Sequence, residues 1–522
     1  MKDELFKPYL QNDILLLPPA LGELVEANHP VRVVNDIIDA LDLSFLIDTY
    51  KGGGAPSYHP KMLLKVIVYA YLCNIYSGRQ MERELKENIH FMWLSGMARP
   101  DFRTINLFRS KRLGKGNLEK IFVQVVELLN AEGLVSLDVQ YIDGTKIESV
   151  ANKYTFVWRG TVEKNRARLQ KKVKIVLEQA NQQLVKEEQE SIPNNDLTVQ
   201  ELQEKTERIL EKVQQSNNID KKVKKKLIKE LNVIKDEKVS KLSTYDNNLR
   251  ILGERNSFSK TDTEATFLHM KEDAMRNGQT KPGYNVQIAT ENQYITHYDI
   301  FWRPTDTGTL IPFLQSFYNT YNKTSKEIVA DSGYGSEENY KYLFDNNMVP
   351  YVKFNMFHYE QKRKYKNNPF ITANFKYDNE KDEYICPNGQ RLSFVETRQT
   401  KSDLNFTSTI SLYRAKDCSS CPFREECYKG HGTAKTMQVN YKLKEYKEKV
   451  RELLNSEKGL EHRSKRPIEV ESVFGNIKFN HGFKRFKLKS RAKVKIEFGL
   501  VALAHNLRKY ANAIINQQEV IA

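Results

Sequence analysis

The chain has 522 residues and a formal net charge of +16, from 82 Lys and Arg against 66 Asp and Glu. This length buries at least one large core and suggests roughly two to four domains, which excludes a peptide or a single small module. The basic balance favours a polyanionic partner, first of all nucleic acid. The most apolar stretch, 62–73, is interrupted by Lys65 and is too short to span a bilayer. We therefore expect a soluble cytoplasmic protein, associated with the nucleoid and without a membrane partner.

The first quarter of the sequence, residues 1–134, is predicted to be an all-helical domain. Apolar and capping residues predict helices over 62–72, 81–89 and 102–112. Helix, turn and basic helix is the outline of a helix-turn-helix DNA reader, but a plain helical bundle with a solvated basic face fits the pattern equally well. Under the first interpretation, the third helix contributes DNA contacts from Arg103 and Arg109.

The character of the sequence changes after this region. Residues 138–143 alternate between apolar and polar and then meet a glycine, which predicts a strand that ends there. No aromatic residue occurs between Trp158 and Tyr245, although 11% of the chain is aromatic. We interpret 159–250 as an insertion of long charged helices, folded as a hairpin. It can contact DNA or a second subunit, but a charged spacer is the simpler interpretation.

The elements that follow predict the fold class. Strands are predicted over 284–290, 295–300 and 327–331, with a helix over 307–321 before the last of them. Without the insertion the order is strand, strand, strand, helix, strand, the opening half of an α/β, ribonuclease-H-like fold with a mixed sheet flanked by helices. A further strand is predicted over 350–354 and a terminal helix over 494–515. The predicted organisation is a helix-turn-helix-like domain over 1–134 and a ribonuclease-H-like domain over 135–515, with insertions over 159–250 and 355–440.

Two acidic residues stand at the ends of predicted neighbouring strands, Asp143 after the first and Asp331 after the fourth. Cleavage of a phosphodiester by two metal ions needs carboxylate oxygens that converge on ions about 3.5 to 4 Å apart, and Mg²⁺ or Mn²⁺ suits such ligands. Each acid is followed by glycine within two residues, which lets a phosphate approach the backbone. Either aspartate alone is more often a plain turn residue, so the interpretation depends on their joint placement.

The third acid of such a site is expected from a helix predicted over 468–478. Glu471 and Lys478 are seven residues apart, two helical turns, so they share one face beside an apolar stripe. The carboxylate can bind metal while the ammonium of Lys478 holds a phosphate. The alternative is an ordinary surface pair, and Glu469 is the competing acid, although it projects to a different side of the helix.

These residues lie in three blocks, 141–146, 328–336 and 466–478. Together the blocks resemble those of DDE transposases of bacterial insertion sequences, and most of all the insertion-sequence eleven-eighty-two group. The resemblance extends over nearly the whole chain, since 57–62 is similar to the helical N-terminal domain of that family and 281–285 to the block before its second strand. Each motif alone is weak, but the set is specific.

The resemblance implies catalysis and metal binding by Asp143, Asp331 and Glu471, with strand cleavage and strand transfer by a two-metal mechanism. It also implies double-stranded DNA as partner, both terminal inverted repeats and target, and a homodimer or higher oligomer in the active complex. Related transposases place an arginine four residues before the catalytic glutamate. Here that place is Pro467, and Arg466 lies one residue earlier. We retain Arg466 as an expected phosphate contact.

Four of the five cysteines form a cluster late in the chain: Cys386, Cys418, Cys421 and Cys427. Four thiolates with one CxxC pair can form a tetrahedral structural Zn²⁺ site. Reduced cysteines packed in a small subdomain are the alternative, because the last spacing is irregular.

A basic segment follows the predicted acidic helix. Between Lys478 and Lys495 the chain carries eight basic residues and no acid. A solvated charge run is the usual interpretation of such a segment. Directly after the acidic helix it would line the path of DNA, and we expect Lys484, Arg485 and Lys487 to contact phosphates.

Three functions fit these features: an active transposase, a metal-dependent nuclease with the same site, and a catalytically inactive DNA-binding regulator. The presence of all three acids disfavours the inactive regulator. The helical N-terminal domain and the insertion favour a transposase over a simple nuclease.

Overall fold

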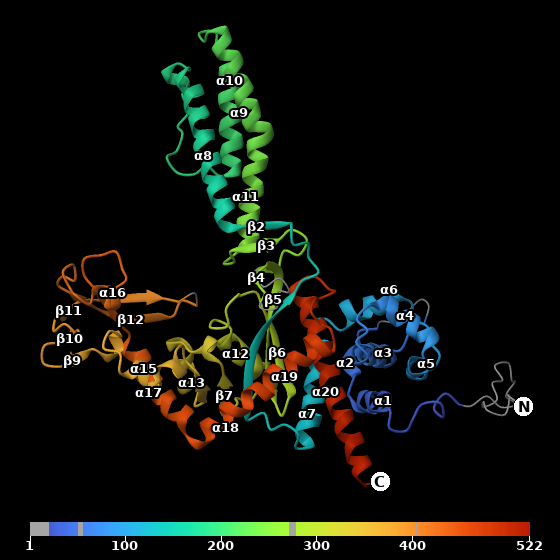
Figure 1. The fold of residues 1–522 in the computed structure, drawn as a ribbon. Coiled ribbons are helices and arrows are strands. Elements are labelled where there is room, and N and C mark those ends of the chain that lie inside the picture. The colour runs from blue at the N-terminus through green and yellow to red at the C-terminus, as the bar shows by residue number, and fades with distance from the viewer. Residues whose placement is uncertain (1–19, 51–55, 271–277, 403, 522) are drawn as a thin grey trace, which may run out of the picture.

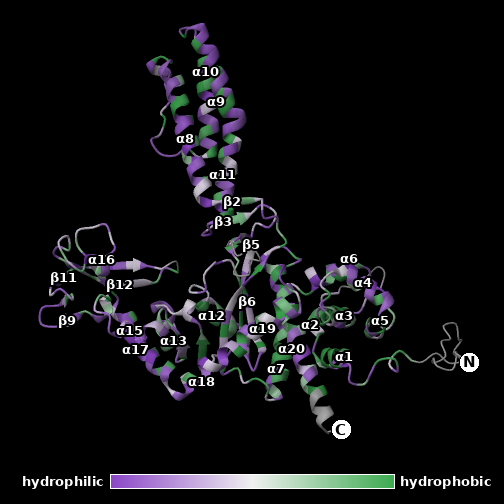
Figure 2. Cartoon of the chain, in the orientation of Figure 1, coloured by the Kyte–Doolittle hydropathy of each residue, from purple (hydrophilic) through white to green (hydrophobic). Residues whose placement is uncertain are grey.

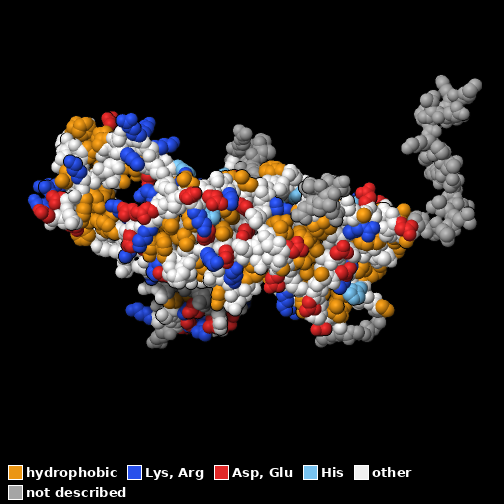
Figure 3. Space-filling model, turned by 90° about the horizontal axis from the view of Figure 1, so that it is seen from below, with side chains coloured by type: hydrophobic (Ala, Val, Ile, Leu, Met, Phe, Trp, Pro, Cys, Tyr) orange, Lys and Arg blue, Asp and Glu red, His pale blue; other side chains and the backbone are white. Residues whose placement is uncertain are grey.

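The computed structural model describes residues 20–50, 56–270, 278–402 and 404–521 (Figure 1). A mixed sheet lies at the centre, with helices of the N-terminal region on one side, a long helical arm above it and a smaller β-rich unit on the other side. No helix among these described residues combines the length and apolar character needed to cross a membrane. On the face seen in Figure 3, Lys and Arg side chains are interspersed with Asp and Glu, so the net positive charge is not gathered into one patch there.

The N-terminal region is helical, as predicted. Its elements are α1 (Pro30–Ala40), α2 (Ser44–Ile47), α3 (Pro60–Leu72), α4 (Gly78–Glu87), α5 (Ile89–Ser95), α6 (Phe102–Leu107), the π-helical turn η2 (Phe108–Arg112) and α7 (Asn117–Ala131). The helix expected over 81–89 is in fact two helices. Asn88 adopts an extended conformation that ends α4, and its side chain accepts a hydrogen bond from the backbone N–H of His90 to begin α5.

The central sheet has the strands β1 (Val139–Glu148), β4 (Thr266–His269), β5 (Thr280–Glu291), β6 (Tyr294–Phe301), β7 (Glu327–Ala330) and β8 (Val349–Val352). Their order is β4-β5-β1-β7-β8, with β6 also paired to β5. Residues 141–148 pair antiparallel with 283–290 of β5, whereas 139–142 pair parallel with β7. The first strand was expected to end at residue 143, and that expectation was wrong, because its pairing with β5 continues to Glu148.

Helices from the second half of the chain cover the sheet. They are α12 (Leu310–Tyr321), the 3₁₀ turn η5 (Ser332–Tyr334), α13 (Glu337–Asp345), α17 (Tyr441–Asn455), α18 (Glu457–Arg466), the π-helical turn η7 (Pro467–Glu471), α19 (Ser472–Gly475), the π-helical turn η8 (Asn476–Asn480) and α20 (Arg491–Ile521). α20 packs on α3 and α7 on one side and on β6 on the other. One hydrophobic core therefore runs from Val25 to Leu507 and joins the N-terminal helices to the sheet.

The insertion after β1 is a helical arm that stands on a small two-stranded sheet (Figure 1). Its elements are β2 (Phe156–Trp158), α8 (Arg159–Gln182), the 3₁₀ turn η3 (Lys186–Glu188), α9 (Val199–Gln215), α10 (Lys221–Val233), the π-helical turn η4 (Ile234–Lys238), α11 (Val239–Leu252) and β3 (Ser257–Ser259). Hydrophilic residues are frequent along the helices of the arm (Figure 2). Its buried side chains form a core of their own, so it is a folded unit with more helices than the expected hairpin.

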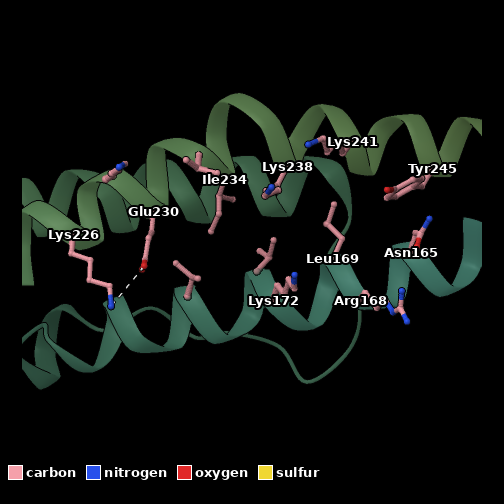
Figure 4. A pocket seen from close by; sticks show the side chains of 14 residues that line it. Asn165, Arg168, Leu169, Lys172, Lys226, Glu230, Ile234, Lys238, Lys241 and Tyr245 are labelled. Carbon is pink, nitrogen blue, oxygen red and sulfur yellow. Dashed lines mark ion pairs between the residues drawn. The ribbon is translucent and has the colours of Figure 1, made fainter.

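A cavity of about 750 Å³ opens along the arm, between α8 on one side and α10, η4 and α11 on the other (Figure 4). Apolar side chains such as Leu169 and Ile234 lie in its floor. Six cations line it against the single acid Glu230: Arg168, Lys172, Lys226, Lys229, Lys238 and Lys241.

The segment expected as a second insertion is a β-rich unit. It contains α14 (Phe357–Glu360), α15 (Arg363–Lys366), the 3₁₀ turn η6 (Thr372–Asn374), β9 (Lys376–Asp378), β10 (Glu383–Ile385), β11 (Arg391–Lys401), β12 (Thr407–Ala415), α16 (Arg424–Cys427) and β13 (Thr436–Val439). The strands form a five-stranded antiparallel sheet in the order β13-β12-β11-β10-β9. Its small core includes Cys386, Cys418 and Cys427 at the edge.

Candidate active site

The register of three parallel strands places two of the predicted acids side by side. Ile142 of β1 pairs with Ala330 of β7, and Ala330 pairs with Val352 of β8. The residues that follow this aligned row are, from β1 to β8, Asp143, Asp331 and Lys353.

The backbone beside each aspartate fixes one of its two oxygens. Oδ1 of Asp143 accepts a hydrogen bond of 2.8 Å from the N–H of Gly144, and Oδ1 of Asp331 accepts one of 2.8 Å from the N–H of Gly333. The Oδ2 atoms of both residues instead contact the guanidinium of Arg466. The glycines therefore turn the two carboxylates so that equivalent oxygens face the same cation.

Arg466, at the end of α18, brings in the third acid. Its Nη2 lies 3.2 Å from Oδ2 of Asp143 and 3.8 Å from Oδ2 of Asp331, while its Nη1 donates to Oε1 of Glu471 at 3.1 Å. The Arg466 side chain is only 8% exposed, against 58% for Glu471. Its Nε is buried and has no hydrogen-bond partner among the described residues. Three predicted acids thus meet on one guanidinium.

A π-helical turn explains the unusual spacing of Arg466 and Glu471. The turn η7 covers Pro467–Glu471, between the two residues that form the ion pair. A π-helical turn is closed by an i to i+5 hydrogen bond and so holds one residue more than an α-helical turn. Residues five apart therefore lie on one face here, as residues four apart do in an α-helix. The extra residue that displaces the arginine in the sequence is absorbed in the helix.

The competing acid, Glu469, lies on another side of the same turn. It is buried, and its Oε2 accepts a hydrogen bond of 2.7 Å from the backbone N–H of Gln293 in the β5–β6 connection. Burial raises the pKa of Glu469. Glu469 therefore anchors the helix to the sheet and does not face Asp143 and Asp331.

Lys478, the expected phosphate contact, is also buried and lies within η8.

Lys353 is a site residue that the sequence interpretation missed. It follows β8 directly, next to Asp331 in the aligned row, and its side chain is half-buried. Burial, followed by the neighbouring charges of Arg466 and Arg463, lowers the pKa of Lys353. The sequence offered only a weak signal, a lysine one residue before the end of the predicted strand 350–354.

A fourth carboxylate, Asp306, lies behind the row. Its Oδ1 accepts hydrogen bonds from Nδ2 of Asn285 at 2.8 Å and from Nε2 of Gln287 at 2.9 Å. Tyr334, just after Asp331, donates from its hydroxyl to Oε1 of Gln287. Burial, together with the surrounding carboxylates, raises the pKa of Tyr334 far above its usual range, so the tyrosine remains a donor. This network holds the floor of the site in one arrangement.

The basic residues expected to contact DNA have different environments. Arg103 is exposed on α6, beside the ring of Phe102. Arg109 is buried, which corrects the expectation that it contacts DNA. Its guanidinium donates to the hydroxyl of Tyr71, to the backbone oxygen of Tyr76 and to Oδ1 of Asn106, and so ties helices of the N-terminal region together.

The basic side chains of the segment before α20 differ in their contacts. Lys484 is exposed, with its ammonium over the ring of Phe479. Lys487 is exposed too, although its backbone N–H donates to the buried Glu497. Arg485 donates to the backbone carbonyls of three successive residues after β1, at 3.0 to 3.3 Å. Arg485 therefore holds the segment against the sheet, and only part of its side chain remains for a phosphate.

The four predicted zinc ligands line one small cavity of about 110 Å³. Nδ2 of Asn388 lies 3.6 Å from Sγ of Cys421, the backbone N–H of Lys435 donates to Sγ of Cys418, and Nζ of Lys435 lies 3.2 Å from Sγ of Cys427. Three of the four cysteine sulfurs are therefore in contact with a nitrogen that carries hydrogen. All the cysteines are free thiols.

Among the described residues, no group of three or more His, Cys, Asp or Glu side chains is arranged to hold a metal ion. At the acidic site, the guanidinium of Arg466 contacts all three carboxylates. The donor set is nevertheless the one that Mg²⁺ and Mn²⁺ prefer, namely carboxylate oxygens from neighbouring elements. The residues therefore fit divalent ions of this kind.

Comparison with known families assigns two parts of the chain. Residues 385–511 match the family model of a transposase DDE domain, and residues 19–111 match that of a transposase domain, DUF772. Glu471 and the four clustered cysteines lie within the first match, whereas Asp143 and Asp331 lie outside both. No curated protein and no solved structure matches the chain. The two matches support a DDE transposase of the insertion-sequence type, an enzyme that acts on DNA.

Proposed function

We propose that this chain is a DNA transposase that binds the terminal inverted repeats of an insertion sequence, cleaves DNA strands with divalent metal ions and transfers the freed 3′ ends to target DNA. Its catalytic region is proposed to be ribonuclease-H-like, and its group the insertion-sequence eleven-eighty-two group. The observation that carries the proposal is the convergence of Asp143, Asp331 and Glu471 on the single guanidinium of Arg466. Carboxylates from three separate parts of the chain around one cation form a candidate functional site.

The strand order supports the ribonuclease-H-like assignment. β6, β5 and β1 form an antiparallel meander, and β7 and β8 continue the sheet in parallel beyond β1. Acids from the two central strands, β1 and β7, then meet an acid from a later helix. This arrangement agrees with the resemblance of the three sequence blocks.

The chain's own groups have distinct roles in this proposal. Mg²⁺ or Mn²⁺, when bound, supplies an activated water and stabilises the leaving oxygen. The carboxylates of Asp143, Asp331 and Glu471 would hold these ions. The half-buried Lys353 lies beside Asp331 and binds a non-bridging phosphate oxygen.

DNA binding is proposed for exposed cations outside the acidic site. Arg103 on α6 contacts the phosphate backbone, as do Lys484 and Lys487 after η8. The cavity along the arm is a further proposed contact for a phosphate backbone, since six basic side chains and one acidic side chain line it (Figure 4). An active complex of two or more copies pairs the two ends of the element.

A cleavage and strand-transfer assay on DNA that carries the element ends tests the proposal. With Mg²⁺ or Mn²⁺, the wild type is expected to cut and join, and Asp143→Asn, Asp331→Asn and Glu471→Gln each lose roughly a thousandfold or more of the cleavage rate while end binding persists. Glu469→Gln is the matched control, which retains cleavage if it folds.

Each alternative function has its own outcome in this assay. Cleavage without joining identifies a nuclease, and end binding without cleavage by the wild type identifies an inactive regulator. If Glu469→Gln is inactive and Glu471→Gln is active, the third acid is misassigned.

Structural zinc in the β-rich unit is a separate proposal. Its support is that Cys386, Cys418, Cys421 and Cys427 line one cavity. Metal analysis of the purified chain is expected to give one zinc per copy, and Cys418→Ser with Cys421→Ser is expected to remove it. A zinc-free wild type that melts at the same temperature with and without added Zn²⁺ would leave the cysteines as packing residues.

A further inference from the structure

We infer that Arg466 is an internal counter-ion of the acidic site, which holds the three carboxylates together before metal binds and must leave them when divalent ions enter. The inference rests on the proposed function, because it takes Asp143, Asp331 and Glu471 as the metal ligands. It adds a competition between a side chain of the protein and the metal ion.

The first argument is the position of the guanidinium. Its Nη2 and Nη1 lie 3.1 to 3.8 Å from the oxygens of all three carboxylates. Three carboxylates this close would repel one another, and a cation among them removes that repulsion. The Arg466 and Asp143 side chains are only 8% and 16% exposed, so water screens this pair little, whereas Asp331 and Glu471 are more open to solvent at 37% and 58%. Arg466 therefore occupies the place of the cation that the site requires.

The second argument is that the guanidinium and a metal ion need the same atoms. Oδ1 of Asp143 and Oδ1 of Asp331 already accept hydrogen bonds from the backbone beside them. The oxygens that point into the site are the Oδ2 atoms and Oε1 of Glu471, and these are the atoms that Arg466 contacts. A divalent ion that binds them also repels the guanidinium. Entry of the metal therefore displaces Arg466.

The third argument concerns where Arg466 goes. Its Nε is buried without a hydrogen-bond partner among the described residues, so the observed position leaves one donor of the guanidinium unsatisfied. A DNA phosphate can accept two parallel N–H bonds from a guanidinium. Transfer of Arg466 from the carboxylates to a phosphate satisfies its donors and vacates the metal site. Metal and DNA should therefore each increase the affinity for the other.

Mn²⁺ binding to the full chain without DNA tests the inference by calorimetry or electron paramagnetic resonance. Arg466→Gln is expected to bind Mn²⁺ roughly tenfold or more tightly than the wild type, because a buried competing charge is removed. Lys465→Gln removes the same charge from an exposed neighbouring position, where Lys465 pairs with Glu461, and is expected to stay within about twofold of the wild type. Equal or weaker Mn²⁺ binding by Arg466→Gln overturns the inference.

A melting experiment keeps the test decisive if Arg466→Gln is poorly stable. In chelator, Arg466→Gln is expected to melt below the wild type, since the carboxylates lose their counter-ion. Saturating Mn²⁺ should then raise its melting temperature more than that of the wild type. An equal or smaller rise overturns the inference.

Asp143→Asn separates this inference from the proposed function. It is expected to lose Mn²⁺ binding whatever Arg466 does. If Asp143→Asn binds Mn²⁺ as well as the wild type, the metal site itself is misplaced and the proposed function fails. If Asp143→Asn loses the metal but Arg466→Gln gains no affinity, only the counter-ion inference fails.

Discussion

Arg466 donates a hydrogen bond of 3.1 Å to Glu471 across five residues of chain, inside a helix. In an α-helix of 3.6 residues per turn, residues five apart lie about 140° from each other and cannot meet. The π-helical turn Pro467–Glu471 holds one residue more than an α-helical turn, which brings residues five apart onto the same face. π-helical turns of this kind are frequent at functional sites, and here the turn aligns a cation with an acid.

Deletion of Ile468 is therefore expected to be tolerated. The residue is 59% exposed within the turn, and its loss converts a π-helical turn into an α-helical turn in which Arg466 and Glu471 become four apart. Thermal melting should shift by only a few degrees. Deletion of the exposed Ser464 from regular α18 is the control, because it rotates the buried His462 away from the sheet and is expected to cost about 3 kcal/mol or more. An equal loss of stability from both deletions would contradict the interpretation that η7 contains one inserted residue.

Gly144 is expected to be intolerant of alanine for a packing reason. A Cβ at this position would lie 2.6 Å from Oδ1 of Asp306 and would also clash with Nε2 of Gln287. Gly144→Ala should therefore lower the free energy of unfolding by about 1 to 3 kcal/mol, measured by urea titration. Gly160→Ala in α8 meets nothing within 4 Å and should be neutral or stabilising by up to about 1 kcal/mol. If the two substitutions behave alike, the network does not pack against Gly144 as described.

The stability of the protein is expected to fall as the pH falls below about 6.5, and His297 is one cause. Burial among Phe313, Phe317 and Tyr321 lowers the pKa of His297 from 6.5 to about 3. The unfolded chain binds a proton below pH 6.5 while the folded chain does not. Stability is then lost between about pH 6.5 and 3, by up to roughly 1.4 kcal/mol per pH unit for this group.

Urea unfolding at pH 7.5 and 5.0 measures this loss. His297→Phe should reduce the difference between the two pH values. His431→Phe, at an exposed position, should keep the wild-type difference. An unchanged difference in His297→Phe would show that other groups govern the acid sensitivity.

Two neighbouring cations are expected to respond differently to removal. Lys484 is exposed, so Lys484→Gln should weaken DNA binding and reduce the slope of log affinity against log salt by about one, without a change in melting temperature. Arg485 donates to three backbone carbonyls, so Arg485→Gln should lower the free energy of unfolding by about 1 to 3 kcal/mol. Loss of stability in Lys484→Gln, or none in Arg485→Gln, would reverse these assignments.

The sequence predicts most of the central strands in chain order and that Asp143 and Asp331 lie on neighbouring strands, because alternating and apolar runs are local patterns, although β1 continues past Asp143 to Glu148. Their orientation toward one guanidinium was not predictable, since it depends on a register between strands nearly two hundred residues apart. The displaced arginine looked like a departure from the family because a π-helical turn leaves no clear mark in sequence. Arg109 was misjudged because an arginine on a helix does not reveal which partners surround it.

Lys353 also shows what sequence patterns do not reveal. It follows β8 directly, as Asp331 follows β7, but a lysine after a strand carries no chemical signature on its own. Its proximity to the acids follows only from the parallel pairing of β7 with β8. The insertion at 159–250 was correctly predicted to be helical, but its own core depends on contacts between helices that composition does not specify.

The shared core of the N-terminal helices and the sheet has one more consequence. α20 packs against α3 on one side and β6 on the other, and one apolar cluster joins the two regions. A DNA end held by the N-terminal helices, as proposed, would then lie at a set distance from Asp143 and Asp331. The packing of α20 would then fix the position of the cut, counted in base pairs from the recognised repeat.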